Sequence, residues 1–134
     1  MRLNINSPAY YSKQFGIENE IYNMCRGLSN FVRDKEYSSI VDTIGIVPII
    51  APKDEIEAGK WREEKIYDIK HKFVFISKQI NYEEYCNSDI ETRKKLIIKN
   101  ILDSVRSIHK KAKFDYKKFE NDIKEFVTSY IEKI

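Results

Sequence analysis

Residues 40–50, Ile-Val-Asp-Thr-Ile-Gly-Ile-Val-Pro-Ile-Ile, are the stretch of sequence that decides the fold. The stretch is rich in β-branched residues, almost continuously apolar and too short for a comfortable helix, so it predicts a strand. Its near-continuous apolarity indicates burial on both faces, or an edge strand that another element partly covers. Pro48 cannot donate a backbone hydrogen bond, which predicts an edge or a bulge at that position.

Strand and helix patterns lie on either side of this stretch. Before it, residues 2–6 predict a short strand, and apolar residues at helical spacing predict a helix over residues 13–35. After it comes a polar connection, residues 51–59. Residues 61–70 then alternate like an antiparallel strand with one wet face, and residues 73–80 predict the next strand. The break between these two strands predicts a tight hairpin or a bulge.

The last third of the chain carries helix signals. Ser88 and Glu91 match the capping box of a helix N-terminus, and apolar residues at helical spacing follow them. Asp115 is a good N-cap for a final helix, and Phe114 and Phe119 have the spacing of a hydrophobic staple around it. The sequence therefore predicts two long helices at the carboxyl end.

The pattern as a whole indicates an α+β fold in the order β-α-β-β-β-α-α, with an extra helical turn at residues 81–86. We expect a small, mainly antiparallel sheet with helices packed on one face. The chain has 134 residues with no repeat and no linker-like segment, so we expect residues 1–134 to form one domain.

Composition narrows the class of protein. Hydrophobic residues make up 42% and charged residues 34%, with no apolar run near the ~18 residues of a membrane span. Residues 1–6 lack a signal-peptide core, so we expect the mature chain to start at Met1. Two cysteines, Cys25 and Cys86, are too few for a disulfide scaffold and indicate the reducing cytoplasm. The net charge of +3 is spread along the chain and argues against a nucleic-acid partner chosen by bulk charge.

No catalytic, cofactor or metal motif is present. His71 and His109 have no Ser or Cys beside them in a recognisable nucleophile motif. The four glycines stand singly, which excludes the common phosphate-binding loops. The two cysteines are isolated and lack metal-ligand spacing. We therefore expect a protein that is not an enzyme and that has no cofactor and no metal.

Two features could serve binding. The segment 110–118 contains five lysines interleaved with Phe114 and Tyr116, as in a weak RNA-binding strip, although a helix end and the staple account for the same residues. The chain also has nine tyrosines, and exposed tyrosines with Trp61 and Arg62 have the composition of a protein-binding patch. An AT-rich genome, which raises Ile, Lys, Asn and Tyr together, explains the tyrosines equally well.

The chain resembles the immunity proteins of bacterial polymorphic toxin and contact-dependent inhibition systems. The resemblance covers residues 61–124, and it rests on Trp61 to Lys65, Phe73 to Ile80, Asn81 to Tyr85, Ile97 to Ser107 and Phe114 to Phe119. It implies a cytoplasmic inhibitor that binds a cognate toxin domain and blocks its active site sterically, with no catalytic residues of its own. A small nucleic-acid-binding accessory protein that uses residues 110–118 is the alternative.

The implied partner suggests where binding occurs. Many such toxins are nucleases with basic surfaces, which would favour an acidic patch beside an aromatic anchor. The candidate partner-binding residues are Asp54, Glu55, Glu57, Trp61, Arg62, Glu63 and Glu64. We expect a monomer, or a homodimer formed by strand pairing if the Ile-rich strand at residues 40–50 lies at an edge.

Overall fold

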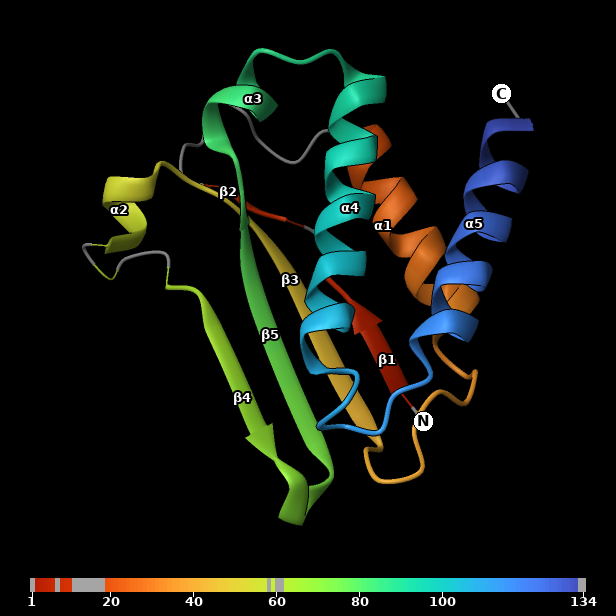
Figure 1. Ribbon diagram of the computed structural model, residues 1–134. Helices are drawn as coiled ribbons and strands as arrows, with labels where there is room; N and C mark the ends of the chain where they lie inside the picture. The colour runs from red at the N-terminus through yellow and green to blue at the C-terminus, as the bar shows by residue number, and fades with distance from the viewer. Residues whose placement is uncertain (1, 7, 11–18, 58, 60–61, 133–134) are drawn as a thin grey trace.

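The computed structural model describes residues 2–6, 8–10, 19–57, 59 and 62–132 (Figure 1). In chain order the elements are β1 (Arg2–Ile5), β2 (Ala9–Tyr10), α1 (Asn19–Val32), β3 (Thr43–Ile50), α2 (Lys53–Glu57), β4 (Glu64–Asp68), the 3-10 turn η1 (Ile69–His71), β5 (Phe73–Ile80), α3 (Tyr82–Cys86), α4 (Ile90–Ile108) and α5 (Tyr116–Glu132). The prediction of an α+β fold is confirmed.

The sheet is mixed and mostly parallel. Its strands lie in the order β1-β3-β5-β4, and the short β2 pairs with the end of β3. β3 runs parallel to β1, β2 and β5, and only β4 and β5 are antiparallel. The prediction of a mainly antiparallel sheet is therefore wrong, and the order of elements also differs from the prediction. The physical reason is that a helix-containing connection allows a parallel crossover, which α1 supplies between β1 and β3.

The apolar stretch that decides the fold forms the centre of the sheet. Of the two predicted alternatives for β3, burial on both faces agrees with the structure, and the edge strand is wrong because β3 has partners on both sides. This strand therefore offers no edge for a homodimer. The carbonyl of Ile46 accepts a hydrogen bond from Asn6 at 2.9 Å, so by alternation Pro48 directs its nitrogen toward the same side. On that side the β1 pairing ends at Ile46 and the β2 pairing begins at Ile49. Pro48 thus lies where the ladder is already interrupted.

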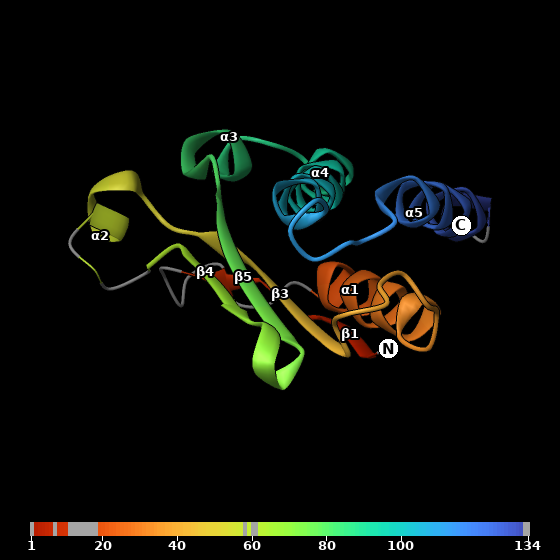
Figure 2. The same cartoon turned by 60° about the horizontal axis from the view of Figure 1, so that its bottom comes forward.

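The long helices lie on one face of the sheet, as predicted (Figure 2). α1 packs on β1, α4 packs on β5 and β3, and α5 contacts the two other long helices from outside. The fully buried large side chains come from every layer: Leu3, Ile21, Leu28, Ile44, Ile46, Ile50, Tyr85, Ile97, Ile101, Ile108, Phe119 and Ile123. Burial of these side chains against the sheet is the main source of stability.

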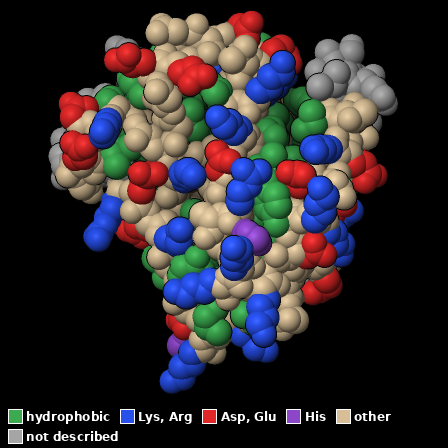
Figure 3. Space-filling model, viewed as in Figure 1, with side chains coloured by type: hydrophobic (Ala, Val, Ile, Leu, Met, Phe, Trp, Pro, Cys, Tyr) green, Lys and Arg blue, Asp and Glu red, His purple; other side chains and the backbone are tan. Residues whose placement is uncertain are grey.

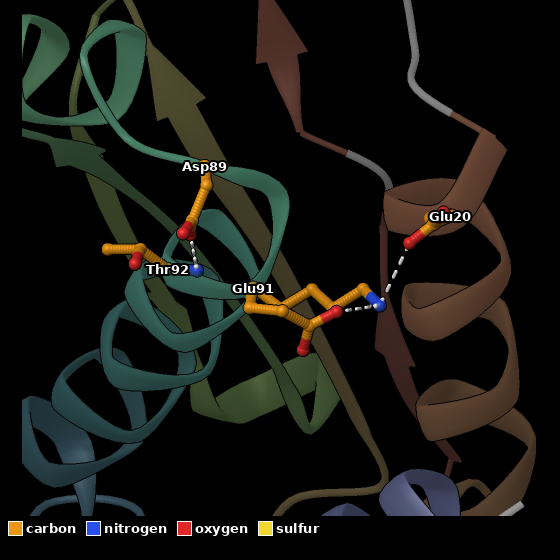
Figure 4. Close-up of polar contacts among 5 residues, drawn as sticks. Glu20, Asp89, Glu91 and Thr92 are labelled. Atoms are coloured by element: carbon orange, nitrogen blue, oxygen red, sulfur yellow. Dashed lines mark hydrogen bonds and ion pairs between the residues drawn. The ribbon is translucent and has the colours of Figure 1, made fainter. Parts of the chain in front are cut away.

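The helix starts only partly follow the sequence signals. The predicted helix over 13–35 appears as α1, and residues 13–18 lie outside the described residues. Asp89 is the N-cap of α4, because its side chain accepts from the backbone N–H of Thr92 at 2.8 Å (Figure 4). Ser88 instead donates its hydroxyl to the carbonyl of Glu84, so the predicted capping box is wrong.

The start of the last helix agrees with the prediction. The side chain of Asp115 accepts a hydrogen bond from the backbone N–H of Lys118 at 3.1 Å, as an N-cap does. The rings of Phe114 and Phe119 meet edge to face with their centroids 5.5 Å apart, which confirms the predicted staple.

A buried ammonium group joins the three long helices. Lys94 of α4 is 6% exposed. Its Nζ lies 3.0 Å from a carboxylate oxygen of Glu20 on α1 and 3.1 Å from one of Glu91 (Figure 4). The same Nζ lies 5.3 Å from the ring centre of Tyr130 on α5. Burial favours the neutral form of Lys94, but the hydrogen bonds that its ammonium donates to Glu20 and Glu91 outweigh burial and raise the pKa of Lys94.

The two edges of the sheet differ. Along β1, the backbone N–H of Leu3 donates to the carbonyl of Arg33, and that of Ile5 donates to the hydroxyl of Ser29 at 3.1 Å. The outer edge of β1 is therefore covered by α1 and the residue that follows it. No described strand pairs with the outer edge of β4. The tight hairpin predicted between β4 and β5 is present, with η1 at its tip.

The Tyr37 hydroxyl is expected to contribute measurably to stability. It donates to Asp122 at 2.6 Å, and its ring packs between Phe114 and Phe119. A hydrogen bond to a carboxylate in a partly buried site is worth about 1–2 kcal/mol, so Tyr37→Phe should lower the free energy of unfolding in urea by that amount. Tyr22→Phe is the control, because Tyr22 is 41% exposed. Equal losses in the two variants would show that the Asp122 contact is not the cause.

Candidate functional site

A hollow opens where two neighbouring parallel strands end. The register of β3 and β5 places Ile50 opposite Ile80, so the short helices α2 and α3 both begin at the same end of the sheet (Figure 1). The space between them measures about 710 Å³, and we call it the acidic hollow. Its lining residues are Pro52, Lys53, Asp54, Glu57, Gln79, Asn81, Tyr82 and Glu83. The carboxyl ends of parallel strands are a common place for binding sites.

Hydrogen bonds hold the floor of the acidic hollow in place. The side-chain amide of Gln79 donates to the carbonyl of Ala51 at 2.6 Å, which joins the end of β5 to the end of β3. The backbone N–H of Gln79 donates to the carboxylate of Glu63 at 2.9 Å. The side chain of Asn81 accepts from the backbone N–H of Glu84 at 2.9 Å and caps α3. These bonds fix the walls before any partner arrives.

The acidic hollow carries an excess of negative charge. Its lining contains three carboxylates, Asp54, Glu57 and Glu83, against the single ammonium of Lys53. Lys53 lies 3.9 Å from Glu57, but both side chains are largely exposed, so this ion pair offsets little of the charge. Asp and Glu side chains gather at the upper left of the molecule, over α2 and α3 (Figure 3). The site can therefore attract a cationic surface.

The structure brings together only part of the predicted partner-binding set. Asp54 and Glu57 line the acidic hollow, and Glu63 is bonded to its floor residue Gln79. Glu55 lies on α2 but is not among the lining residues, and Trp61 lies outside the described residues. Glu83 is the acidic residue that the sequence reasoning missed.

Arg62 and Glu64 belong to a different surface. They line a shallow depression of about 520 Å³ together with residues such as Val47, Ile49 and Phe75. Alternation along β4 explains the separation, because Glu64 pairs with Ser77 and Ile66 pairs with Phe75. Glu64 also lines a further depression of about 280 Å³ together with Glu63, so the predicted residues spread over several adjoining surfaces instead of one acidic patch.

A second hollow, between α4 and α5, was not predicted. We call it the α4/α5 groove; it measures about 390 Å³. Its apolar lining consists of Met24, Ile98, Leu102, Phe126, Val127 and Tyr130. One sequence signal could have found it. Ile98 and Leu102 widen the apolar stripe of α4 beyond the Ile97 and Ile101 positions that pack in the core, so α4 has more apolar surface than the sheet covers.

The His, Cys, Asp and Glu side chains of the described residues do not gather as the ligands of a metal site do. No group of three His, Cys, Asp or Glu within the described ranges could hold a metal ion. Burial raises the pKa of the Cys25 thiol to about 12, which is typical of an inert core cysteine. His71 contacts Asp68 at 2.7 Å on the exposed hairpin, and His109 packs near the ring of Tyr116.

The lysine-rich segment 110–118 buries Phe114 and leaves Tyr116 half-buried. Phe114 is 4% exposed and takes part in the staple. The Tyr116 hydroxyl accepts from Arg106 at 2.9 Å and donates to Glu120 at 3.1 Å. Lys118 donates to the carbonyl of Glu36 at 2.7 Å. These aromatic side chains serve packing and helix contacts instead of a platform for stacked bases.

Comparison with known proteins identifies the family. A family model described as immunity protein 44 matches residues 1–129. The chain belongs to the immunity protein 44 family. The resemblance over residues 61–124 is thereby confirmed and extends over nearly the whole chain. Comparisons with curated proteins and with solved structures find no match.

As a member of the immunity protein 44 family, the chain is an immunity protein against a toxin. Immunity proteins are generally not enzymes, so we expect no enzymatic role from a member of this family. None of the described helices is long and apolar enough to cross a membrane. The acidic hollow and the α4/α5 groove are thus two surfaces of an immunity protein, and each is a candidate for contact with a partner.

The contact between His71 and Asp68 makes a testable prediction about proton binding. Hydrogen bonds from the ring and from the backbone N–H of His71 hold the pKa of the Asp68 carboxyl below its usual value. In His71→Ala the ring is lost while the backbone N–H remains, so the Asp68 pKa should rise without reaching its ordinary value. Carboxyl ¹³C NMR against pH measures it.

Asp89 is the internal control for this titration. Its pKa is lowered by the backbone N–H of Thr92, far from the hairpin in the sequence, so it should not change in His71→Ala. If the two carboxyls shift together, or if neither shifts, the assigned cause is wrong.

Proposed function

We propose that the chain binds and sterically neutralises a cognate toxin domain of a bacterial polymorphic toxin or contact-dependent inhibition system, and that the toxin is a nuclease. The observation that carries this proposal is the acidic hollow, with three carboxylates against one ammonium. A nuclease binds phosphates with a basic surface, and an acidic surface placed against it excludes the nucleic acid. Complementary charge also speeds association.

The lining of the acidic hollow suits a cationic anchor from the toxin. Gln79 and Asn81 supply amide groups, and Tyr82 supplies a ring beside them. An arginine side chain that enters this space can pair with a carboxylate and also contact the ring. Such anchors, taken out of water at the centre of an interface, dominate binding energy in protein complexes.

The rest of the predicted set enters the proposal in different ways. Glu63 lies beside the acidic hollow through its bond to Gln79, so we include it in the toxin-binding surface. Trp61 precedes it by two positions, and we propose it as an aromatic anchor because tryptophan is enriched at interface hot spots. Arg62 and Glu64 line the other depression, and we leave them outside the surface.

The alternative function receives no support from the arrangement of residues 110–118. Base stacking needs exposed aromatic rings, and Phe114 is buried while the half-buried ring of Tyr116 is contacted by His109 and Arg106. We therefore place the interaction with the toxin first. We also propose that the chain acts in the cytoplasm, where a nuclease toxin meets its substrate.

A co-expression survival assay tests the proposal. The product of the reading frame upstream of the gene is expressed with and without this protein, and viable cells are counted. We expect the wild-type chain to restore viability and Asp54→Lys/Glu57→Lys to lose the rescue. With the purified toxin domain, the double variant should weaken binding by at least about tenfold, because two favourable charge contacts become repulsive. The difference should shrink at high salt.

The control for this assay is Asp34→Lys/Glu125→Lys, which makes the same change in net charge at exposed positions away from the acidic hollow. Trp61→Ala, assayed alongside, tests the aromatic anchor separately. If the control loses as much as the double variant, the acidic hollow is not the contact. If the upstream product kills equally with the wild-type chain present, immunity to that product is excluded.

A further inference from the structure

The α4/α5 groove results from how the three long helices are spaced. A Cβ atom added at Gly27 of α1 would lie 3.3 Å from the ring of Phe126, so α5 approaches α1 closely at this glycine. α4 packs on the sheet instead, and Figure 2 shows α4 and α5 side by side with α1 beneath them. The facing sides of α4 and α5 are left partly uncovered, and Met24 of α1 contributes to the lining between them.

The groove combines an apolar lining with a positive rim. Lys94, Lys95, Lys99 and Arg106 line it, against two carboxylates, Glu91 and Asp103. Hydrophobic side chains are visible between Lys and Arg side chains right of centre in Figure 3. These cations all come from α4, so one wall of the groove is positive.

Not all of these cations are equally available to a partner. Lys94 is already bound by two carboxylates. Arg106 is bonded to the hydroxyl of Tyr116 and lies 4.0 Å from Glu120. Lys95 and Lys99 are exposed and make no ion pair within the part of the chain that the structure describes. They stand four residues apart, which puts them on the same side of α4.

We propose that the α4/α5 groove is a docking site for an acidic amphipathic helix of a protein partner. α4 and α5 form the walls of the groove. A helix of the partner can pack between them by inserting apolar side chains at i, i+3 or i+4, and i+7. Carboxylates beside these anchors would meet Lys95 and Lys99. The volume of about 390 Å³ falls in the range of binding pockets. The proposal does not depend on the acidic hollow or on which toxin the chain inhibits.

A designed probe tests the proposal with the full chain. The probe is an acetylated, amidated, fluorescently labelled helix of about 18 residues, with leucines on one face and glutamates beside them. Anisotropy should report saturable binding to the wild-type chain. Lys95→Glu/Lys99→Glu should weaken it at least about tenfold, because two attractive contacts become repulsive. Val127→Thr, which keeps the side-chain shape and replaces a methyl group with a hydroxyl, should weaken it several-fold.

The controls test whether binding depends on the position of the lysines on the protein and on the charge of the probe. Lys70→Glu/Lys110→Glu makes the same charge change at exposed positions outside the groove lining and should bind the probe like the wild-type chain. A matched probe with lysine in place of each glutamate should bind at least about tenfold more weakly. Urea unfolding of each variant checks that the fold is retained.

Several results would overturn the proposal. One is the absence of saturable binding; another is equal binding of the acidic and basic probes. Displacement of the probe by dodecanoate at equal concentration would assign the groove to small anionic amphiphiles instead of a helix. An equal loss in Lys70→Glu/Lys110→Glu would show that the groove lysines have no special part.

Discussion

The parallel pairing of β3 with β5 is the constraint on which the rest of the structure depends. β3 is apolar on both faces and has partners along both sides, so it must lie at the centre of the sheet. Parallel neighbours cannot be joined by a tight turn, which requires long connections before and after β3. The connection before it contains α1, which covers one face of the sheet. The connection after it contains α2 and passes through β4, which takes an outer position beside β5.

The sequence predicted where the strands lie better than how they pair. Residues 73–80 form β5 as predicted, and residues 40–50 contain β3. Strand direction is not encoded in the residues of the strand itself, because the same apolar pattern suits either direction. Only the connections distinguish the two cases, and the one short connection, between β4 and β5, was predicted correctly as a hairpin. The choice between Ser88 and Asp89 as helix cap was decided by the contact of Ser88 with Glu84, which no local pattern reveals.

The error in strand direction also explains why the sequence predicted only the side of the acidic hollow that follows β3 and missed the side that follows β5. Asp54 and Glu57 follow the carboxyl end of β3, and Gln79 and Glu83 lie at or after the carboxyl end of β5. In an antiparallel pair these ends would lie at opposite ends of the sheet. The parallel register, with Ile50 opposite Ile80, brings them together. Alternation along residues 61–70, which the sequence already predicts, puts Arg62 and Glu64 on one face and Glu63 on the other.

No strand among the described residues pairs with the outer edge of β4, and this has a consequence for contacts between copies of the chain. An open strand edge is a template for pairing with an identical strand. Two copies of β4 could pair antiparallel about a twofold axis at Ile66. Glu64 of each copy would then lie opposite Asp68 of the other. Like charges directly opposite each other destabilise such a pair. In this register, the strand at the edge of the described sheet carries charges that oppose edge-to-edge pairing of two copies.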